Sequence, residues 1–303
     1  MRIVLIGQAA FAEKVLDGLR ANGHEVAAVY CPPDGPSGKP DPVKARADAL
    51  GIPVRQHASL KRPEVRDELV ALNADLGVLA YVTQIVPQSV FEVPQLGSIC
   101  FHPSLLPRYR GGSAVNWQII KGETEAGVSV FWVDPGIDTG PLLLQKAAPI
   151  KPDDTAASLY YDTLFPIGVE IVLESVELIA AGKAPRLVQD KALDSYDPLC
   201  RDEHAAVDWS RPVRDVYNLI RGCDPQPGAY TTVRGEKLRL YDARAITGGT
   251  HTPGSVEAVS DEGIVIGTSD GAVRVQRVRF GDKKVAAGEF AAQANVTPGT
   301  TLG

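Results

Sequence analysis

Two residues of this 303-residue chain, an imidazole and a carboxylate, have the chemistry to move protons in a reaction. His102 opens a proline-rich segment, in which Pro103 and Pro107 restrict the backbone and help to hold the imidazole in place. Asp138 lies in residues 133–140, where glycines let the main chain turn tightly around it. Such a pair can donate a hydrogen bond to a developing oxyanion and take a proton from a nucleophile.

Each of these two segments, taken alone, is more typical of a structural role than of catalysis. A histidine directly after a strand is usually a packed, hydrogen-bonded group. An aspartate in a Gly-x-Asp-Thr-Gly turn usually caps a helix or makes an Asx turn. Their meaning therefore depends on the elements that bring them together.

Strands and helices alternate over the first 150 residues. Helical periodicity predicts helices at residues 11–19, 43–50, 63–72 and 112–120, with a turn-rich segment at Pro32–Pro42. Apolar runs predict strands at residues 2–6, 25–30, 52–54, 76–81, 98–101, 128–133 and 142–148. This alternation predicts an α/β fold, whose mostly parallel sheet is covered on both faces. Ligand sites in such folds lie beyond the carboxyl ends of the strands, and His102 and Asp138 both fall at strand ends.

The second half of the chain changes in character. A long helical stretch, residues 155–181, should kink or restart at Pro166. Residues 185–203 lose the periodicity and are predicted to link a catalytic domain, residues 1–184, to a C-terminal domain, residues 204–303. A small, OB-like β-barrel is predicted there, from a helix at 213–220 and strand-like runs at 229–233, 237–241, 263–267 and 272–280.

The strings around His102 and Asp138 resemble those of the folate-dependent formyltransferase family. From His102 the chain reads His-Pro-Ser-Leu-Leu-Pro-Arg-x-Arg-Gly, and from Gly136 it reads Gly-x-Asp-Thr-Gly-x-Leu-Leu-Leu-Gln-Lys, in the family's order and spacing. Further matching segments are residues 114–117, 129–132, 153–155, 164–166 and 183–187. The resemblance runs from residue 1 to about residue 245. It is nearest to the N-terminal hydrolase domain of 10-formyltetrahydrofolate dehydrogenase and next to methionyl-tRNA formyltransferase.

This resemblance implies an enzyme of one-carbon metabolism with the formyltransferase fold, a Rossmann-like sheet followed by a β-barrel domain. It implies removal of the formyl group from 10-formyltetrahydrofolate, with His102 stabilising the oxyanion and Asp138 acting as the base and orienting His102. The pterin ring would lie against the main chain of Leu79, Ala80, Tyr81, Val82, Val133, Asp134 and Gly136. No metal site is expected, because the five histidines show no zinc-ligand spacing.

The residue two positions before His102 bears on the acceptor of the formyl group. Transferases of the family typically carry an asparagine there that helps to hold the oxyanion, whereas this chain has Cys100 and the hydrolase domain also lacks the asparagine. Water or a small amine is therefore the favoured acceptor. The alternative is methionyl-tRNA formyltransferase acting on initiator tRNA. A single basic residue in Pro32–Pro42, and 12 Lys plus Arg against 11 Asp plus Glu in residues 205–303, weigh against that alternative.

Other classes of protein fit the sequence less well. A nicotinamide-dependent dehydrogenase is disfavoured because Gly7 is not followed by the second and third glycines of the dinucleotide fingerprint. An aspartic protease needs two facing carboxylates, and the chain has a single Asp-Thr-Gly. A non-catalytic folate-binding protein stays open, as does a nucleophilic Cys100. Four scattered cysteines and no membrane-length apolar run indicate a cytoplasmic protein that does not enter a membrane. A net charge of −6 makes nucleic acid an unlikely partner, apart from tRNA under the alternative.

Overall fold

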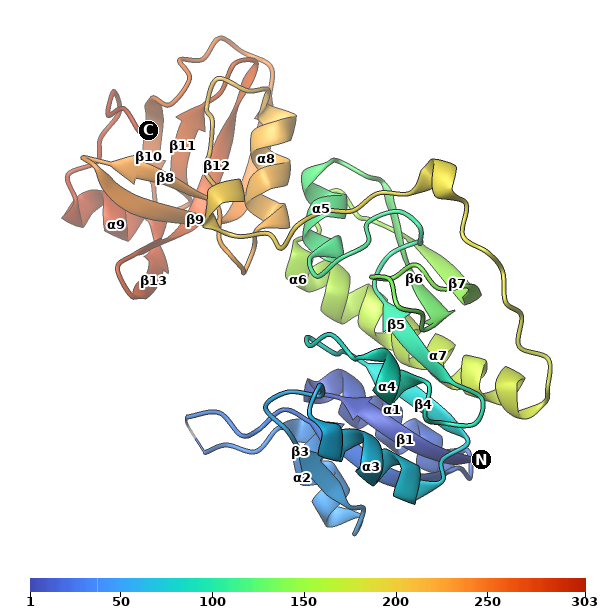
Figure 1. Ribbon diagram of the computed structural model, residues 1–303. Helices are drawn as coiled ribbons and strands as arrows, with labels where there is room; N and C mark the ends of the chain where they lie inside the picture. The colour runs from blue at the N-terminus through green and yellow to red at the C-terminus, as the bar shows by residue number, and fades with distance from the viewer. Residues whose placement is uncertain (37) are drawn as a thin grey trace. The chain divides into compact units, whose positions relative to one another are not determined.

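The computed structural model describes residues 1–36 and 38–303, which form two compact units (Figure 1). One unit comprises residues 1–112, 127–148 and 162–196, and the other comprises residues 113–126, 149–161 and 197–303. The predicted turn-rich segment Pro32–Pro42 includes Ser37, which lies outside the described residues. The domain boundaries expected from the sequence stay a prediction.

The first unit is built on a seven-stranded sheet with the order β3-β2-β1-β4-β5-β6-β7. Its strands are β1 (Arg2–Gly7), β2 (Glu25–Cys31), β3 (Val54–Gln56), β4 (Leu76–Ala80), β5 (Ser98–His102), β6 (Glu125–Trp132) and β7 (Leu142–Pro149). The strands from β3 to β5 pair in parallel, and β6 pairs with β5 in the antiparallel direction. The predicted mostly parallel α/β sheet is confirmed.

The helices of this unit follow the predicted alternation, with one addition. They are α1 (Ala9–Ala21), α2 (Pro42–Ala49), α3 (Pro63–Leu72), α4 (Gln88–Phe91) and α7 (Phe165–Ala180). The single turn of α4 was not predicted, because four residues are too few to show helical periodicity. The stretch predicted as one helix over residues 155–181 consists of α6 (Ala156–Ser158), a π-helical segment (Leu159–Leu164) and α7, which restarts one residue before Pro166.

The alternation of side chains along β5 decides which face of the sheet carries the chemistry. Phe101 points to the face covered by α1 and α7: its ring stacks on Phe11 with the centroids 4.3 Å apart, and a Cβ atom at Gly168 would meet that ring at 2.6 Å. Cys100 points to the opposite face, where it packs against residues of β1, β4 and α3. Because the side-chain period of a strand is two, His102 lies on the same face as Cys100.

The second unit contains a six-stranded antiparallel sheet with the order β10-β11-β12-β9-β8, in which β13 also pairs with β12. Its elements are α5 (Ala114–Ile120), α8 (Val213–Gly222), β8 (Tyr230–Val233), β9 (Glu236–Thr247), β10 (Val256–Ser260), β11 (Gly263–Gly267), β12 (Gly271–Phe280), β13 (Lys283–Ala286) and α9 (Ala287–Gln293). The predicted C-terminal β domain is confirmed. The sequence analysis did not identify β10, β13 or α9.

Candidate active site

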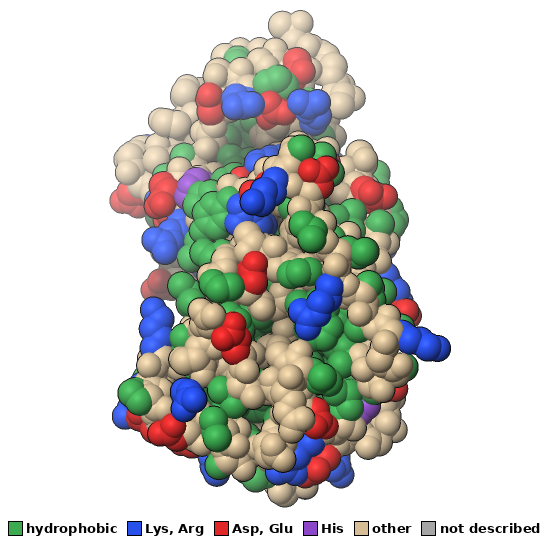
Figure 2. Space-filling view, turned by 45° about the vertical axis from the view of Figure 1, so that its right-hand side comes forward, with side chains coloured by type: hydrophobic (Ala, Val, Ile, Leu, Met, Phe, Trp, Pro, Cys, Tyr) green, Lys and Arg blue, Asp and Glu red, His purple; other side chains and the backbone are tan. Residues whose placement is uncertain are grey.

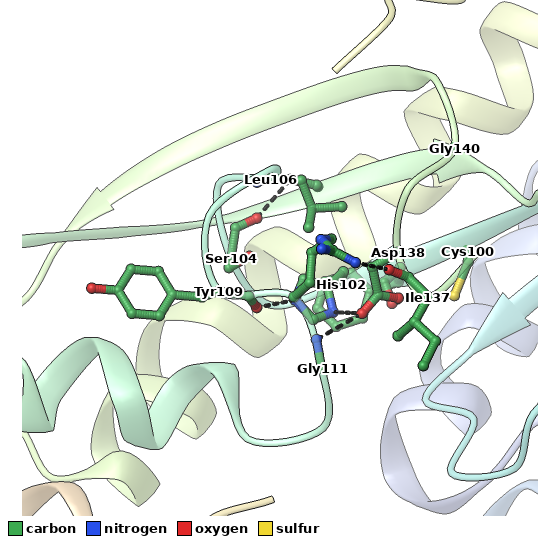
Figure 3. Close-up of polar contacts among 12 residues, drawn as sticks. Cys100, His102, Ser104, Leu106, Tyr109, Gly111, Ile137, Asp138 and Gly140 are labelled. Carbon is green, nitrogen blue, oxygen red and sulfur yellow. Dashed lines mark hydrogen bonds and ion pairs between the residues drawn. The ribbon is translucent and has the colours of Figure 1, made fainter. Parts of the chain in front are cut away.

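His102 ends β5 and is buried, with 5% of its surface exposed. Its Nε2 atom lies 2.8 Å from the carbonyl oxygen of Tyr109. Because a carbonyl can only accept, Nε2 carries a proton and donates it to Tyr109. The other ring nitrogen, Nδ1, faces Asp138 (Figure 3). The imidazole is therefore oriented by the main chain of its own loop, and Nδ1 is the nitrogen left for chemistry.

The loop that follows His102 is fastened by a serine hydroxyl on the neighbouring strand. Ser129 lies opposite His102 in the β5–β6 register. Its hydroxyl donates to the carbonyl oxygen of Ser104 at 2.6 Å and accepts from the amide of Leu106 at 3.1 Å and from Nε2 of Gln145 at 2.8 Å. One donor and two acceptor positions are all in use, so the hydroxyl is satisfied although it is buried. The sequence analysis did not assign this role to Ser129 or Gln145.

Asp138 lies beside His102, with its Oδ2 atom 3.6 Å from Nδ1 of the imidazole. That separation suits an ion pair with a protonated ring but is longer than a hydrogen bond. The same Oδ2 atom accepts a 2.9 Å hydrogen bond from the amide of Gly111. The hydrogen bond that the ring makes is to the carbonyl oxygen of Tyr109, and the orienting role that the resemblance implied for Asp138 stays a prediction. The carboxylate is the more accessible partner, with 19% of its side chain exposed against 7% for His102.

The backbone around Asp138 is unusual. Asp138 has a φ of +57°, in the left-handed region that aspartate tolerates better than most residues. A Cβ atom at Gly140 would lie 1.7 Å from the carbonyl oxygen of Trp132, and one at Gly136 would lie 1.9 Å from Oγ1 of Thr139. The sequence analysis attributed these glycines to turning freedom. Gly140 is needed because the main chain of Trp132 passes too close for any side chain, whereas a side chain at Gly136 would have to displace the side chain of Thr139.

The first stretch expected to contact a pterin ring lies at the end of β4. Leu79 and Ala80 are buried, and Leu79 lies opposite Cys100 in the strand register. Tyr81 is exposed and has a φ of +61°, so the chain turns sharply as it leaves the sheet. Val82 packs against the same cluster as Cys100. This stretch therefore borders the face of the sheet that carries His102.

The second stretch expected there follows β6. Val133 also packs against the cluster that Cys100 contacts. Oδ1 of Asp134 accepts from the amide of Gly136 at 3.0 Å and from Oγ1 of Thr139 at 2.7 Å, so this carboxylate shapes the loop that leads to Asp138. The two stretches thus meet on one face of the sheet. Binding of a pterin by them stays a prediction.

Cys100 is a thiol held in the protonated state. Burial raises its pKa well above the ordinary value, and the negative charge of Asp138 raises it further. Its sulfur donates to the carbonyl oxygen of Phe101 at 3.5 Å. A thiol nucleophile needs a lowered pKa, so this environment disfavours a nucleophilic Cys100.

Cys100→Ser is accordingly expected to keep kcat within about 3-fold of the unmodified protein, because serine preserves the size of the side chain and no thiolate is required. The measurement, made on both proteins, is the steady-state rate of the formyl-group release that the resemblance implies. A loss of about 100-fold or more would establish the thiol as the nucleophile.

A small pocket opens in the first unit at the carboxyl ends of β1, β2 and β4. Ile6, Tyr30, His57 and Val82 are among its lining residues, whereas His102 and Asp138 are not. Val82 thus borders both this pocket and the predicted folate face. His102 and Asp138 therefore lie outside this pocket.

The carboxylate of Asp41 lies at the start of α1. Both carboxylate oxygens of Asp41 accept from the amide of Ala9, at 2.9 and 3.0 Å, and Oδ1 also accepts from the amide of Val43 at the start of α2. A dinucleotide would need its phosphate at this helix terminus. A Cβ atom at Gly7 would lie 2.2 Å from the carbonyl oxygen of Ala80, so this glycine permits close strand packing. Both observations disfavour a nicotinamide cofactor.

Asp41→Ala is expected to lower the free energy of unfolding by about 1–2 kcal/mol, because the starts of two helices lose the same capping carboxylate. Chemical denaturation followed by circular dichroism measures the change. Asp48→Ala, on the exposed surface of α2, is the matched control and should change stability by less than about 0.5 kcal/mol. Equal stability of the two variants would show that Asp41 is not the cap.

Two further properties concern the part of the chain that the structure describes, residues 1–36 and 38–303. It contains no group of three or more His, Cys, Asp or Glu side chains placed to hold a metal ion. None of its helices is both long and apolar enough to cross a membrane.

An imidazole beside a carboxylate, beyond the end of an inner strand of an α/β sheet, can move protons to and from a reacting group. The chain belongs to the formyl transferase family. Residues 1–172 match the formyl transferase domain, and residues 200–295 match the formyl transferase C-terminal domain. The family likeness inferred from the strings around His102 and Asp138 is thereby confirmed, and the protein is an enzyme of the folate-dependent formyltransferase family.

Individual relatives are similar over different shares of their length. Methionyl-tRNA formyltransferase of Geobacter sulfurreducens is 42% identical over 100% of this chain and 97% of its own length. Human cytosolic 10-formyltetrahydrofolate dehydrogenase is 38% identical over 94% of this chain, which corresponds to 33% of the dehydrogenase. The crystal structure of HypX from Aquifex aeolicus in complex with tetrahydrofolic acid shares the fold, with a TM-score of 0.70 and 24% identity over 97% of this chain and 47% of HypX.

Proposed function

We propose that the protein transfers the formyl group of 10-formyltetrahydrofolate to the amino group of methionyl-tRNA. The observation that carries this proposal is the match to a methionyl-tRNA formyltransferase over the whole of this chain and nearly the whole of the relative. The dehydrogenase relatives support the same formyl donor, but this chain spans only a third of their length.

The favoured acceptor therefore changes from that of the sequence analysis, which ranked water or a small amine above initiator tRNA. That ranking rested on Cys100 and on the nearly balanced charge of residues 205–303. Net charge is a weak guide, because phosphate contacts depend on local groups of basic side chains. On the face in Figure 2, basic and acidic side chains are interspersed.

His102 and Asp138 each have one role in the proposed reaction. The amine attacks the formyl carbon, and the carbonyl oxygen becomes an oxyanion that a protonated Nδ1 of His102 stabilises. Asp138 accepts the proton that the amine loses, and the bond from the formyl carbon to N10 of the folate then breaks. Asp138 returns this proton to N10, so one C–N bond is exchanged for another and Asp138 is again a carboxylate. The 3.6 Å between His102 and Asp138 supports action on the same reacting group.

Water is the second candidate acceptor, and Cys100 is the observation that favours it. A weak thiol donor on the face of His102 replaces the asparagine amide that family transferases typically use to hold the oxyanion. With water as the nucleophile, the products are formate and tetrahydrofolate, and Asp138 would serve as the same base.

The acceptor is tested by incubating the protein with 10-formyltetrahydrofolate and following tetrahydrofolate release. We expect release to depend on added initiator tRNA charged with methionine and to match the formylmethionyl-tRNA formed. Uncharged tRNA is the control and should give no release. Steady release in buffer alone, with formate as the product, would replace the tRNA proposal by the hydrolase. No release under either condition would contradict both.

A further inference from the structure

The segment that follows α7 runs along the two loops that carry His102 and Asp138. We call residues 187–196 the strap. Leu187 bridges to Leu142 of β7 at one end, and Tyr196 bridges to Arg110 at the other. Between them, Ser195 accepts from the amide of Tyr109 through its hydroxyl at 2.8 Å and from the amide of Arg110 through its carbonyl oxygen at 2.9 Å. The whole strap falls in residues 185–203, the segment that the sequence analysis expected to be a linker.

Gln189 is the buried residue of the strap, with 8% of its surface exposed. Its Nε2 atom donates to the carbonyl oxygen of Asp138 at 2.9 Å and to that of Gly140 at 2.7 Å. Two carbonyl acceptors fix the orientation of the amide, because a reversed amide would turn its oxygen toward them. Its Oε1 atom has no hydrogen-bond partner among the residues described. The buried amide of Gln189 therefore serves to hold the loop that carries Asp138.

Arg110 also connects the strap to the loop that carries Asp138. Nη1 of Arg110 donates to the carbonyl oxygen of Ile137 at 2.9 Å. Nε and Nη2 of the same guanidinium form a two-pronged pair with Asp194 of the strap, at 2.5 and 2.7 Å. A bidentate pair of this kind fixes the plane of the guanidinium as well as its place. Arg110 is thus held by the strap while it holds the loop.

The hydrogen bonds from Gln189 and Arg110 act on the loop that carries Asp138, whose backbone conformation is uncommon. Asp138 is a non-glycine residue in the left-handed region, a conformation that aspartate tolerates but that costs free energy unless its surroundings support it. The carbonyl groups of residues 137, 138 and 140 are all bound by Arg110 or Gln189. Release of these carbonyl groups would let the carboxylate shift relative to His102. A shift of about 1 Å at a reacting group can lower a rate by about 100-fold.

We propose that the strap positions Asp138 against His102, directly through Gln189 and indirectly through the Asp194–Arg110 pair. Gln189 and Asp194 are positioning residues, since they act through the loop and not on the substrate. The inference rests on the proposed catalytic roles of His102 and Asp138.

Gln189→Glu tests the direct tie, because it keeps the shape of the side chain and replaces the donor by a carboxylate facing two carbonyl oxygens. We expect kcat for formyl transfer to fall by about 10- to 100-fold, with KM for 10-formyltetrahydrofolate changed by less than about 3-fold. Activity relative to the unmodified protein should recover as the pH falls, because the protonated acid can donate to one carbonyl again. Gln189→Leu lacks any donor and should show the loss without the recovery.

Gln95→Glu, an exposed change of the same kind, is the matched control and should leave kcat and its pH profile unchanged. Asp194→Asn tests the indirect tie at a more exposed position and should lower kcat by roughly 5-fold. It keeps the proposal testable if substitution of the buried Gln189 prevents folding. Thermal unfolding of every variant separates a loss of positioning from a loss of folded protein.

The outcomes separate this inference from the proposed function. Inactive His102→Ala and Asp138→Asn variants beside normal kcat in the Gln189 and Asp194 variants would overturn the positioning role and leave the proposed function standing. Full activity of the His102 and Asp138 variants would overturn the proposed function itself. A kcat loss in Gln189→Glu with no pH recovery, accompanied by a matching loss of folded protein, would show that the strap is merely structural.

Discussion

His102→Ala is expected to lower kcat for formyl transfer by about 1,000-fold, the range found when a positioned acid–base group or oxyanion donor is removed. The loss arises because Nδ1 is the ring nitrogen that faces Asp138, while Nε2 is committed to the carbonyl oxygen of Tyr109. KM for 10-formyltetrahydrofolate should change little, since the imidazole acts mainly on the transition state. Single-turnover formyl release measures the effect directly.

Substitution of a histidine outside the candidate site provides the control. His251 pairs with Glu257 in the second unit, and His251→Ala should retain kcat within about 2-fold. A His102→Ala enzyme that keeps more than about a tenth of normal kcat would mean that the imidazole is a structural group of β5.

Asp138→Asn is expected to lower kcat by a similar factor, about 1,000-fold, because the amide cannot accept the proton that the nucleophile loses. Asparagine suits this position as a test. It tolerates the left-handed φ of +57°, and its side-chain oxygen can still accept from the amide of Gly111. The fold should therefore persist while the chemistry stops. Formation of formylmethionyl-tRNA from charged initiator tRNA should fall by this factor, and no release should appear in buffer alone.

Asp134→Asn is the matched control, four residues away in the same loop. Its side-chain oxygen can keep the bonds from Gly136 and Thr139, so kcat should stay within about 3-fold. Equal losses in the Asp134 and Asp138 variants would point to the loop's shape, and not to a base at residue 138.

Much of the fold could be predicted because its signals are local. The buried strands β1 and β4 are unbroken apolar runs, and α1 repeats its apolar residues at helical spacing. The elements that were missed, α4, β10, β13 and α9, have four to seven residues each and too few repeats to show a period. The reversed direction of β6 was also hidden, because strand polarity depends on how the chain returns to the sheet and not on the strand's own residues.

The residues of the candidate site also differ in whether a local sequence signal marks them. His102 and Asp138 could be proposed because characteristic strings surround them. The partners that hold them could not, because the contacts are made by carbonyl groups that every residue carries. Tyr109 orients the imidazole through its backbone oxygen, and Gln189 binds carbonyl oxygens 49 and 51 residues away in the chain. The acceptor stays a prediction, because one cysteine and a net charge do not describe the surface that would bind it.

The strap also bears on how small an active form of this enzyme can be made. A fragment ending at residue 184 would keep both members of the acid–base pair and every strand of the seven-stranded sheet, yet it would lack Gln189, Asp194 and Ser195. Such a fragment would thus lose the hydrogen bonds that hold the loops around His102 and Asp138, although it would keep both of these residues. If the strap positions Asp138 as proposed, the minimal catalytic unit extends at least to Tyr196.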